Sequence, residues 1–504
     1  MPPTTPEPSA ASTLGPIRLC SEEELDATFD IAIIGGGIYG VSALLEASRR
    51  GAKAVLLEAG DFGGGVSWSS HRIIHGGLRY LQSLDIARFR ESVRERRWFM
   101  ETFPDAIRPL SCLVPLPGKG TRRASLFACA SVMNNALNAA FGGSSPRISS
   151  ARVMSKAQIA SSAPEVFPES IRAVGAWQDG LMVSSERVLI CMLRLACDLG
   201  GRAMRDTRVT GIEIVPEPEK QITLACDHAD RGSIGVRAKR VINCAGPSSG
   251  SVAQLLGGSH PRLFEPLRAF NVLLDVEPQI TDAVALDAPS LDGRMLFVVP
   301  GPAGLAIGTW EEPAEGGSTP TVSSVERLID AAGDVLGRSD LALDHVSAVW
   351  SGLLPRAADG RLSPSDRPVF VDHGKAGGVE GAFSVSGVKY TTARLVAQRA
   401  VLAAMPSAGV ARSVVPIGDP ILPADWLTTP PDPADTEVVV RRIVRDEAAV
   451  SVDDICLRRT AWYTSPECLR RSAAAIGAAL KLDQEASARA VDEALAAARA
   501  MRDG

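Results

Sequence analysis

The sequence predicts an α/β protein with three parts: a parallel sheet, an antiparallel sheet and a small C-terminal helical domain. Three observations lead to this fold class. Residues 29–58 read as strand, glycine turn, helix and strand, residues 260–350 hold short strand-like runs, and residues 435–504 are rich in helical patterns. A chain of 504 residues has room for two or three domains with a large core.

The N-terminal motif is the most specific of these patterns. An apolar strand over residues 31–34 runs into G-x-G-x-x-G, and a helix and a second apolar strand follow. The first glycine permits a tight turn, the second lets backbone N–H groups approach a pyrophosphate, and the third lets the helix pack close to the sheet. The positive end of the helix faces the phosphates, and the acid that ends the second strand is placed to bond a ribose hydroxyl. The predicted cofactor-binding residues of this motif are Gly35, Gly37, Ile38, Gly40 and Glu58.

A Gly/Ser-rich segment follows the second strand. From Gly63 the chain reads GGGVSWSSHRIIHGGLRYL. Such a loop supplies hydroxyls and bare backbone donors suited to phosphates. His75, Arg79 and Tyr80 flank two adjacent glycines, so backbone or ligand can come close to them. A buried structural turn, in which the histidine and the arginine have protein partners, is the alternative interpretation.

This stretch resembles the FAD-dependent glycerol-3-phosphate dehydrogenases, in which the same fingerprint is followed by a Ser-rich loop and Ile-His-Gly-Gly-Leu-Arg-Tyr-Leu. The resemblance covers roughly residues 28–500, is strongest at 30–82 and 381–394, and is faint between about 105 and 170. It implies tightly bound FAD in a Rossmann-like domain, with an antiparallel-sheet substrate domain and a small C-terminal helical domain. It also implies these further cofactor-binding residues: Ser67, Ser69, Ser70, Gly76, Gly77, Val209, Ala245, Gly246, Gly352, Gly387, Val388 and Thr391.

The predicted domain boundaries follow the same comparison. Residues 28–415 form the FAD-dependent oxidoreductase domain, with nucleotide-binding parts at about 28–82, 184–250 and 350–404 and substrate-side parts at about 83–183 and 260–349. Strand-like runs at 270–275, 295–300 and 305–310 predict an antiparallel sheet that floors the substrate cavity. A Pro-rich linker at 416–433 leads to the helical domain at 434–504, and residues 1–27 are expected to be a flexible leader.

Composition restricts the partners. A hydrophobic content of 45%, a charged content of 22% and a net charge of −5 are typical of a globular protein and argue against nucleic acid as a partner. The nine cysteines form no C-x-x-C pair and are expected to be reduced, buried thiols of a cytoplasmic protein; no metal site is expected.

One segment raises the question of a membrane. No stretch reaches 18 uninterrupted apolar residues, so no span is expected. Residues 122–141 are helical, widely apolar and led by two arginines. This helix is expected to cover the substrate site; peripheral contact with the inner face of a membrane is the alternative. A homodimer is a further alternative to a monomer.

A second contact with the flavin is expected at residues 381–394. There a strand, a glycine and a helix over about 390–404 follow in order. A helix N-terminus at Gly387 and Lys389 would point its positive end at the flavin and favour the anionic reduced form. The family has Gly-Gly-Lys at this place, and Val388 replaces its second glycine.

Oxidation of an alcohol by a flavin requires a group that takes the hydroxyl proton and cations for an anionic tail. His75 lies inside a ligand-facing motif and is the candidate proton acceptor. Arg79 and Lys389 are the candidate cations, and these three are the predicted catalytic residues. The predicted substrate-binding residues are Tyr80, Arg356 and Arg367, the last of which matches a family position that reaches toward the substrate.

Three departures from the family concern the substrate. Ser-Gly-Val-Arg-Pro appears here as SGLLP at residues 351–355, so Leu354 stands where the family has an arginine. Arg356, two residues further, is expected to compensate for that arginine. Gly-Thr-Thr-Asp appears as GTWE, which is expected to place the ring of Trp310 near the cavity. Lys-Gly-Ser-His appears as RAFN at residues 268–271. These changes predict a changed or larger substrate with FAD binding intact.

The resemblance implies a dehydrogenase that oxidises the secondary alcohol of glycerol 3-phosphate, or of a related polyol phosphate, to a ketone. Hydride would pass to the flavin, and electrons would leave to a quinone or another acceptor. One alternative is an amine or hydroxy-acid oxidase of the same fold. The other is a protein that binds FAD and has lost catalysis.

Overall fold

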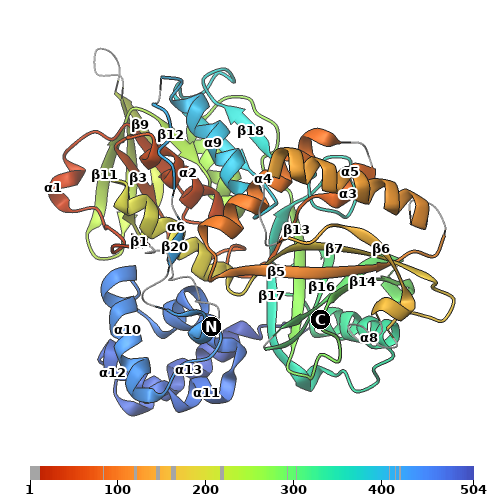
Figure 1. Ribbon diagram of the computed structural model, residues 1–504. Helices are drawn as coiled ribbons and strands as arrows, with labels where there is room; N and C mark the ends of the chain where they lie inside the picture. The colour runs from red at the N-terminus through yellow and green to blue at the C-terminus, as the bar shows by residue number, and fades with distance from the viewer. Residues whose placement is uncertain are drawn as a thin grey trace, which may run out of the picture.

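A computed structural model describes residues 12–82, 85–118, 122–142, 148–159, 166–215, 221–291, 293–301, 303–407, 409–414, 416–418 and 422–503. Figure 1 shows a parallel-sheet part, a nine-stranded sheet beside it, and C-terminal helices that lie below the first and next to the second. The predicted fold class is confirmed.

The parallel-sheet part is built on six strands. Their order is β18 (Val369–Asp372), β19 (Ala382–Ser386), β12 (Val241–Asn243), β2 (Ile31–Ile34), β3 (Ala54–Leu57) and β8 (Arg202–Met204), and all neighbours are parallel except β18 and β19. Every residue of β2 and β3 is buried, because layers cover both faces of the sheet. One layer holds three helices: α2 (Ile38–Arg49), α6 (Ser185–Asp198) and α9 (Ala393–Ala404). The other holds β9 (Thr207–Val215), β10 (Gln221–His228), β11 (Gly232–Ala238) and α7 (Ser249–Leu256).

The nine-stranded sheet contains all three strand-like runs of residues 260–350. Its order is β17 (Val346–Pro355), β13 (Pro266–Leu274), β16 (Gly304–Pro313), β15 (Arg294–Gly301), β14 (Ala283–Ala288), β5 (Ile107–Pro115), β7 (Ala173–Met182) and β4 (Ile73–Ile74), with β6 (Arg152–Ser155) beside β7. Neighbouring strands are antiparallel except β14 and β5. Gly352 lies in β17 and therefore in this sheet, although its stretch had been assigned to the nucleotide-binding parts.

The two faces of this sheet have different neighbours. Phe270 lies on the face that packs against α8 (Val322–Leu336). Asn271, one residue further, lies on the opposite face, where it pairs with Trp350 and Gly308. That second face carries the proposed site in one part and packs against the C-terminal helices in another.

The prediction of a flexible leader over residues 1–27 is wrong from residue 12 onward, and residues 1–11 lie outside the described part. Residues Ser12–Thr13 form β1 beside β20 (Ile417–Gly418), which lies inside the predicted linker. Leu14 and Ile17 are buried in the core, and a short helix, α1, spans Glu22–Leu25. The apolar residues spaced through this segment are the reason that it packs instead of remaining in solvent.

The C-terminal helices dock through buried ion pairs. They are α10 (Pro433–Glu447), a π-helix (Asp454–Arg459), α11 (Pro466–Arg471), α12 (Ala473–Leu480) and α13 (Gln484–Ala498). The guanidinium of Arg187 in α6 lies 2.5 Å from the carboxylate of Glu447, and that of Arg459 lies 2.7 Å from the carboxylate of Asp61. The linker is packed as well, since Leu422 and Leu427 are buried in the same core as these helices.

Three further helices lie near the site. They are α3 (Leu78–Gln82), α4 (Ile86–Thr102) and α5 (Ala124–Gly142). Phe127 of α5 is buried against Gly175 of β7, while Leu126 and Val132 are exposed on its outer side. Membrane contact through residues 122–141 stays a prediction. In the described part of the chain, no helix combines the length and the apolar character needed to cross a membrane.

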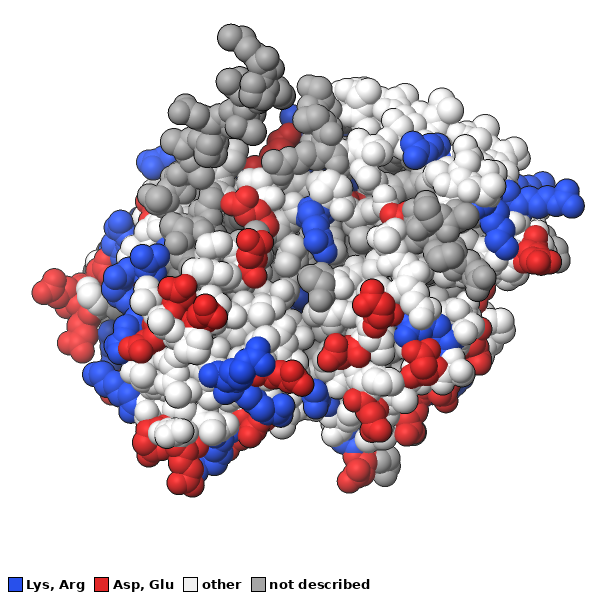
Figure 2. Space-filling model, turned by 60° about the horizontal axis from the view of Figure 1, so that its bottom comes forward, with Lys and Arg blue, Asp and Glu red and all other residues white. Residues whose placement is uncertain are grey.

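The surface charge is mixed. Figure 2 shows acidic and basic side chains interspersed over one face, which agrees with a small net charge of −5.

Candidate active site

The glycines of the N-terminal motif have distinct packing reasons. Gly35 has a φ of +104°, and a Cβ there would lie 2.6 Å from the carbonyl oxygen of Cys244. A Cβ on Gly40 would overlap the carbonyl of Gly35, so α2 needs this glycine to lie close to the sheet. A Cβ on Gly37 would meet only the Ser67 hydroxyl, at 3.2 Å. The turn therefore keeps open space beside the N-terminus of α2, which suits the phosphates of a dinucleotide.

Glu58 lies at the same turn. Its carboxylate accepts hydrogen bonds from the backbone N–H groups of Gly36 at 2.5 Å and Gly60 at 2.8 Å. Burial raises the pKa of Glu58, and the two hydrogen bonds only partly oppose that effect. Glu58 directly follows β3, at the carboxyl ends of the parallel strands. The ribose of the cofactor is predicted to bind there.

The serine loop is joined to α2 and to the nine-stranded sheet. The Ser67 hydroxyl accepts from the N–H of Ile38 at 2.9 Å, and the Ser69 hydroxyl donates to the carbonyl of Ser351 at 2.6 Å. The Ser70 hydroxyl accepts from the N–H of Arg72 at 3.3 Å. These hydroxyls therefore fix the loop between α2 and β17.

Other predicted cofactor residues lie around this loop. Ala245 and Gly246 follow β12 directly beside Gly35, and Val209 is half-buried in β9. A Cβ on Gly352 would lie 2.7 Å from Val66, and one on Gly387 would overlap the ring of Tyr39. Both glycines are therefore required by close packing.

The glycine pair at 76–77 is also required by packing. A Cβ on Gly76 would overlap the guanidinium of Arg96, and one on Gly77 would lie 2.8 Å from the side chain of Ser92. Both neighbours belong to α4. The pair thus lets α4 approach, and the space beside its missing side chains is occupied by protein.

His75 is held by a buried carboxylate that sequence analysis missed. Its Nδ1 lies 3.3 Å from Asp179 of β7, and the side chain of His75 is 55% exposed. Asp179 also accepts from the N–H of Gly76 at 2.6 Å, from Arg96 at 3.1 Å and from the indole of Trp177 at 3.1 Å. Burial alone would raise the pKa of Asp179, but these hydrogen bonds and the charges of His75 and Arg96 lower it to about 2. Asp179 is therefore ionised and orients the ring of His75.

Lys389 and Tyr80 form a second group. The Nζ of Lys389 donates to the Tyr80 hydroxyl and lies 4.7 Å from the centre of its ring. The Tyr39 hydroxyl donates to the carbonyl of Lys389 at 3.1 Å. The Thr391 hydroxyl accepts from the N–H of His75 at 3.2 Å, so the structure brings segments 75–80 and 387–391 together.

The helix expected from about residue 390 begins later. Its first residue is Ala393, so the helix N-terminus does not lie at Gly387 and Lys389, and that prediction is wrong. Residues 387–392 stay outside the helix, and two of their side chains have partners in other segments. Among them, the Tyr390 hydroxyl donates to the carbonyl of Ser185 at 2.8 Å, and Thr391 bonds His75.

The predicted arginines have different positions. The side chain of Arg79 lies outside the described part of the structure, and Arg367 is exposed. Arg356 donates to the carbonyls of Arg361, at 3.1 Å, and Gly360, and lies 3.7 Å from Glu265. The prediction that Arg356 compensates for the arginine missing at position 354 is therefore wrong. Its guanidinium instead bonds carbonyl groups of the loop that follows β17.

Trp310 does not lie near the site, which corrects a second expectation. Gly308 pairs with Asn271 and Trp310 pairs with Phe270, so a bulge at Thr309 puts Gly308 and Trp310 on opposite faces of the sheet. The Trp310 ring is buried against α8, and its indole N–H donates to Glu312 at 3.1 Å.

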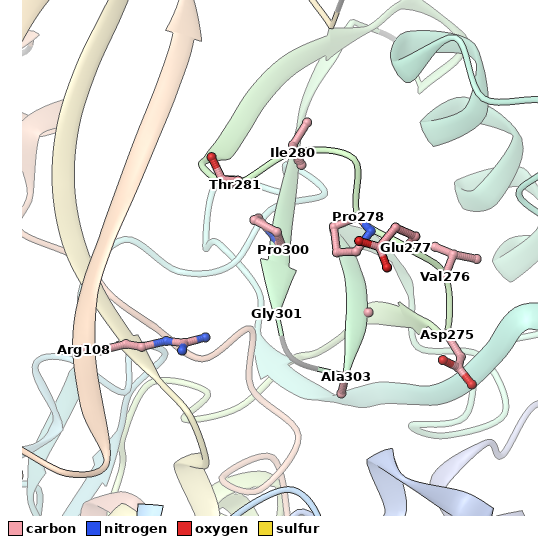
Figure 3. Close-up of a pocket in the computed structure, with 11 residues that line it drawn as sticks. Arg108, Asp275, Val276, Glu277, Pro278, Ile280, Thr281, Pro300, Gly301 and Ala303 are labelled. Carbon is pink, nitrogen blue, oxygen red and sulfur yellow. The ribbon is translucent and has the colours of Figure 1, made fainter. Parts of the chain in front are cut away.

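A cavity of about 620 Å³ lies elsewhere, at the ends of β13, β15 and β16. Figure 3 shows Arg108 reaching toward it from one side, with Asp275 and Glu277 on the other. No predicted site residue lines this cavity. The candidate site therefore stays at the His75 and Lys389 groups.

Comparison with known proteins identifies the class. The family model described as FAD dependent oxidoreductase matches residues 30–401, so the chain belongs to this family. A relative, the alpha-glycerophosphate oxidase of Enterococcus casseliflavus, is 28% identical over 341 residues, which are 66% of this chain and 55% of that protein. Another, glycerol-3-phosphate dehydrogenase 1 of Mycobacterium tuberculosis, is 28% identical over 383 residues, or 73% and 71% of the two chains. The chain thus spans little more than half the length of the first of these relatives.

A solved structure extends the likeness in fold. The glycerol-3-phosphate dehydrogenase of Bacillus halodurans, in complex with FAD, aligns with a TM-score of 0.69 at 19% identity. The alignment covers 94% of this chain and 96% of the Bacillus chain. The predicted resemblance and the FAD cofactor are confirmed. The open turn at Gly37, the N-terminus of α2 and Glu58 are the groups that fit its nucleotide half.

Proposed function

We propose that this protein is a dehydrogenase that oxidises the secondary alcohol of glycerol 3-phosphate, or of a related polyol phosphate, to a ketone. One observation carries the proposal: a histidine oriented by an ionised, buried Asp179 lies one hydrogen bond, through Thr391, from the segment that carries Lys389. The segments that carry a proton acceptor and a cation for an anionic tail are therefore adjacent. The names of the two relatives above support the same substrate class.

Each residue of the proposed site has its own role in this reaction. When bound, FAD supplies the acceptor for hydride. His75 accepts the hydroxyl proton on its Nε2, because its Nδ1 faces Asp179. The ionised Asp179 holds the ring and stabilises the charge that the ring gains. Lys389 attracts the phosphate with a compact positive charge, and its bond to Tyr80 limits where that charge can move.

A reduction screen tests the proposal. The purified protein is mixed anaerobically with glycerol 3-phosphate, other polyol phosphates, glycerol, amino acids and hydroxy acids while the visible flavin band is recorded. We expect rapid bleaching by glycerol 3-phosphate or another polyol phosphate and much slower bleaching by glycerol. Bleaching by amino acids or hydroxy acids alone would support an oxidase instead. No bleaching by any compound would support a protein that has lost catalysis.

We also propose that the electrons leave to a quinone or another small acceptor. The reduced protein can be mixed with a soluble quinone analogue or with oxygen-saturated buffer. Faster reoxidation by the quinone supports a dehydrogenase, and faster reoxidation by oxygen supports an oxidase.

A further inference from the structure

His71 has a polar side chain that the described structure leaves unsatisfied. Both of its ring nitrogens are buried, and neither has a partner of normal hydrogen-bond geometry in the described part of the chain, although the side chain of Asn271 interacts with the ring. Buried polar atoms nearly always have partners, so two unpartnered atoms on one ring require an explanation. None of the roles assigned above uses this residue.

His71 lies above the face of the sheet that carries the site. Its ring packs edge-on against Phe297, with the centroids 6.4 Å apart, and Phe297 packs in the same way against Trp177. The indole of Trp177 donates to Asp179, the carboxylate that holds His75. Phe297 and Asn271 share this face because both pair with Gly308.

The position of His71 is fixed from behind. The next residue, Arg72, has a φ of +61°, and its guanidinium donates to Glu186 at 2.8 Å and to the Tyr463 hydroxyl at 2.6 Å. It also lies 4.4 Å from the centre of the Trp350 ring. The loop is therefore anchored, and the unpartnered nitrogens belong to a ring held in one place.

The ring is neutral at physiological pH. Burial lowers the pKa of His71 to about 4, the nearby His75 acts in the same direction, and the side chain of Asn271 opposes both. A neutral imidazole offers one donor and one acceptor. A hydroxyl group, which can both donate and accept, is its natural partner.

The charge on this side of the site supports the same partner. Leu354 shares the sheet face with Trp350 and supplies no cation. Arg356 is occupied by carbonyl groups of its own loop. On this side of the site, the group presented is a neutral ring whose buried nitrogens can form hydrogen bonds.

We propose that His71 is a specificity-determining residue that hydrogen-bonds a second, non-reacting hydroxyl of the substrate. This inference rests on the proposed function, in which His75 takes the proton of the reacting hydroxyl. It deepens that function, since the preferred substrate must carry a further hydroxyl beside the carbon that is oxidised. A phosphorylated monoalcohol would leave the His71 ring unpaired.

A pair of substrates tests this contact directly. Glycerol 3-phosphate and propane-1,2-diol 1-phosphate differ only in the terminal hydroxyl. We expect the wild-type protein to prefer glycerol 3-phosphate by about tenfold to hundredfold in kcat/KM for flavin reduction. In His71→Phe, which keeps an aromatic ring against Phe297, this ratio should fall to about one. The matched control is His345→Phe, because His345 has a buried unpartnered Nδ1 but lies next to β17 at the far end from the site, and here the ratio should be unchanged.

The outcomes separate the inference from the proposed function. An unchanged ratio in a well-folded His71→Phe protein would overturn the inference and leave the function standing. A loss of bound FAD with an unchanged ratio would also overturn it, since the ring would then serve the cofactor.

A second measurement decides the case in which no polyol phosphate reduces the flavin and the proposed function fails. Long-range ¹H–¹⁵N spectra of histidine-labelled protein, with the His71 signals assigned from their loss in His71→Phe, can be recorded with added glycerol 3-phosphate and glycerol. A shift of the His71 ring nitrogens with either polyol would support the hydroxyl contact without turnover. Unchanged signals would overturn it.

Discussion

Asp179 is the residue that joins most of the proposed site. It bonds the His75 ring, the backbone of Gly76, the guanidinium of Arg96 and the indole of Trp177. These partners come from a loop, from α4 and from β7 itself. Sequence patterns can find the glycines of such a site but not this carboxylate, because its partners lie up to about a hundred positions away. The available signal was an acid inside an otherwise apolar and aromatic strand.

The difference in stability between the wild-type protein and Asp179→Asn should depend on pH in a defined way. The folded pKa of about 2 lies below its ordinary value of 3.8, so the ionised carboxylate stabilises the fold above pH 3.8 and loses that effect as the pH falls toward 2. At neutral pH, Asp179→Asn should cost about 3–5 kcal/mol, because it leaves the buried charge of Arg96 without a carboxylate. Denaturant unfolding at several pH values checks this. A gap between the two proteins that does not narrow below pH 3.8 would contradict it, and the exposed Asp359→Asn is the control.

Gly37→Val should abolish flavin binding while the chain still folds. A Cβ at this position meets only the Ser67 hydroxyl, so the added methyl groups would enter the space of the phosphates. Flavin absorbance per mole of purified protein measures the loss. Gly65→Val is the matched control, because its Cβ meets nothing within 4 Å. A Gly37→Val protein with a full complement of flavin would show that the cofactor lies elsewhere.

Leu354→Arg should improve the affinity for glycerol 3-phosphate. The position lies on the sheet face that carries the site, and Arg356 is committed to carbonyl groups of its own loop. A charge-assisted bond to phosphate contributes about 1.5–3 kcal/mol, so KM should fall about tenfold to hundredfold. Thermal unfolding must be followed too, since a new buried arginine can reduce stability. Weaker turnover in a well-folded variant would mean that another group or another substrate fills this role.

At the scale of elements, the loop over residues 66–75 connects all three parts of the molecule. It bonds α2 through Ser67, β17 through Ser69, and the C-terminal domain through Arg72 and Tyr463. The helical domain therefore supports the site, although it supplies no predicted site residue. The sequence indicated this domain by its helical periodicity, but its contact with the loop spans almost four hundred positions.

Element boundaries depended on contacts of the same long-range kind. The start of α9 at Ala393 follows from the partners that Tyr390 and Thr391 have in other segments. The face of Trp310 follows from one bulge, since residues two apart in a regular strand would share a face. Periodicity within a segment contains neither kind of information. By contrast, the strands and helices of the N-terminal motif were predictable, because local glycine and apolar patterns determine them.

Tyr463→Phe should loosen the loop without unfolding the domain. The Tyr463 hydroxyl accepts from Arg72 at 2.6 Å and from the indole of Trp350 at 2.9 Å, and both donors would lose a buried partner. We expect a loss of about 1–3 kcal/mol and a higher KM, with FAD still bound. Thermal unfolding and steady-state reduction kinetics measure both effects. If only stability falls and KM is unchanged, the C-terminal domain does not position the site loop. Tyr463→Leu, which also removes the ring, indicates how much of the loss is due to packing.

At the scale of the whole molecule, the proposed site lies where the two sheets meet. The parallel sheet presents the nucleotide half at Gly37 and Glu58, and the nine-stranded sheet presents Asp179 and Asn271. The segment that carries Lys389 and the loop that carries His75 meet between them. This arrangement explains how one chain can hold a dinucleotide cofactor and a small polar substrate side by side. It also explains why the largest departures from the family fall on the second sheet, while the nucleotide motif is kept.

The most direct test of this account is the anaerobic reduction of bound flavin by glycerol 3-phosphate, followed by stopped-flow absorbance in the wild-type protein and in His75→Gln. We expect the wild-type flavin band to bleach at saturating substrate. We expect the variant to retain its FAD and to bleach at least about a hundredfold more slowly, because the proton acceptor is lost. A wild-type protein that glycerol 3-phosphate and related polyol phosphates leave oxidised, or a His75→Gln protein reduced at the wild-type rate, would contradict it.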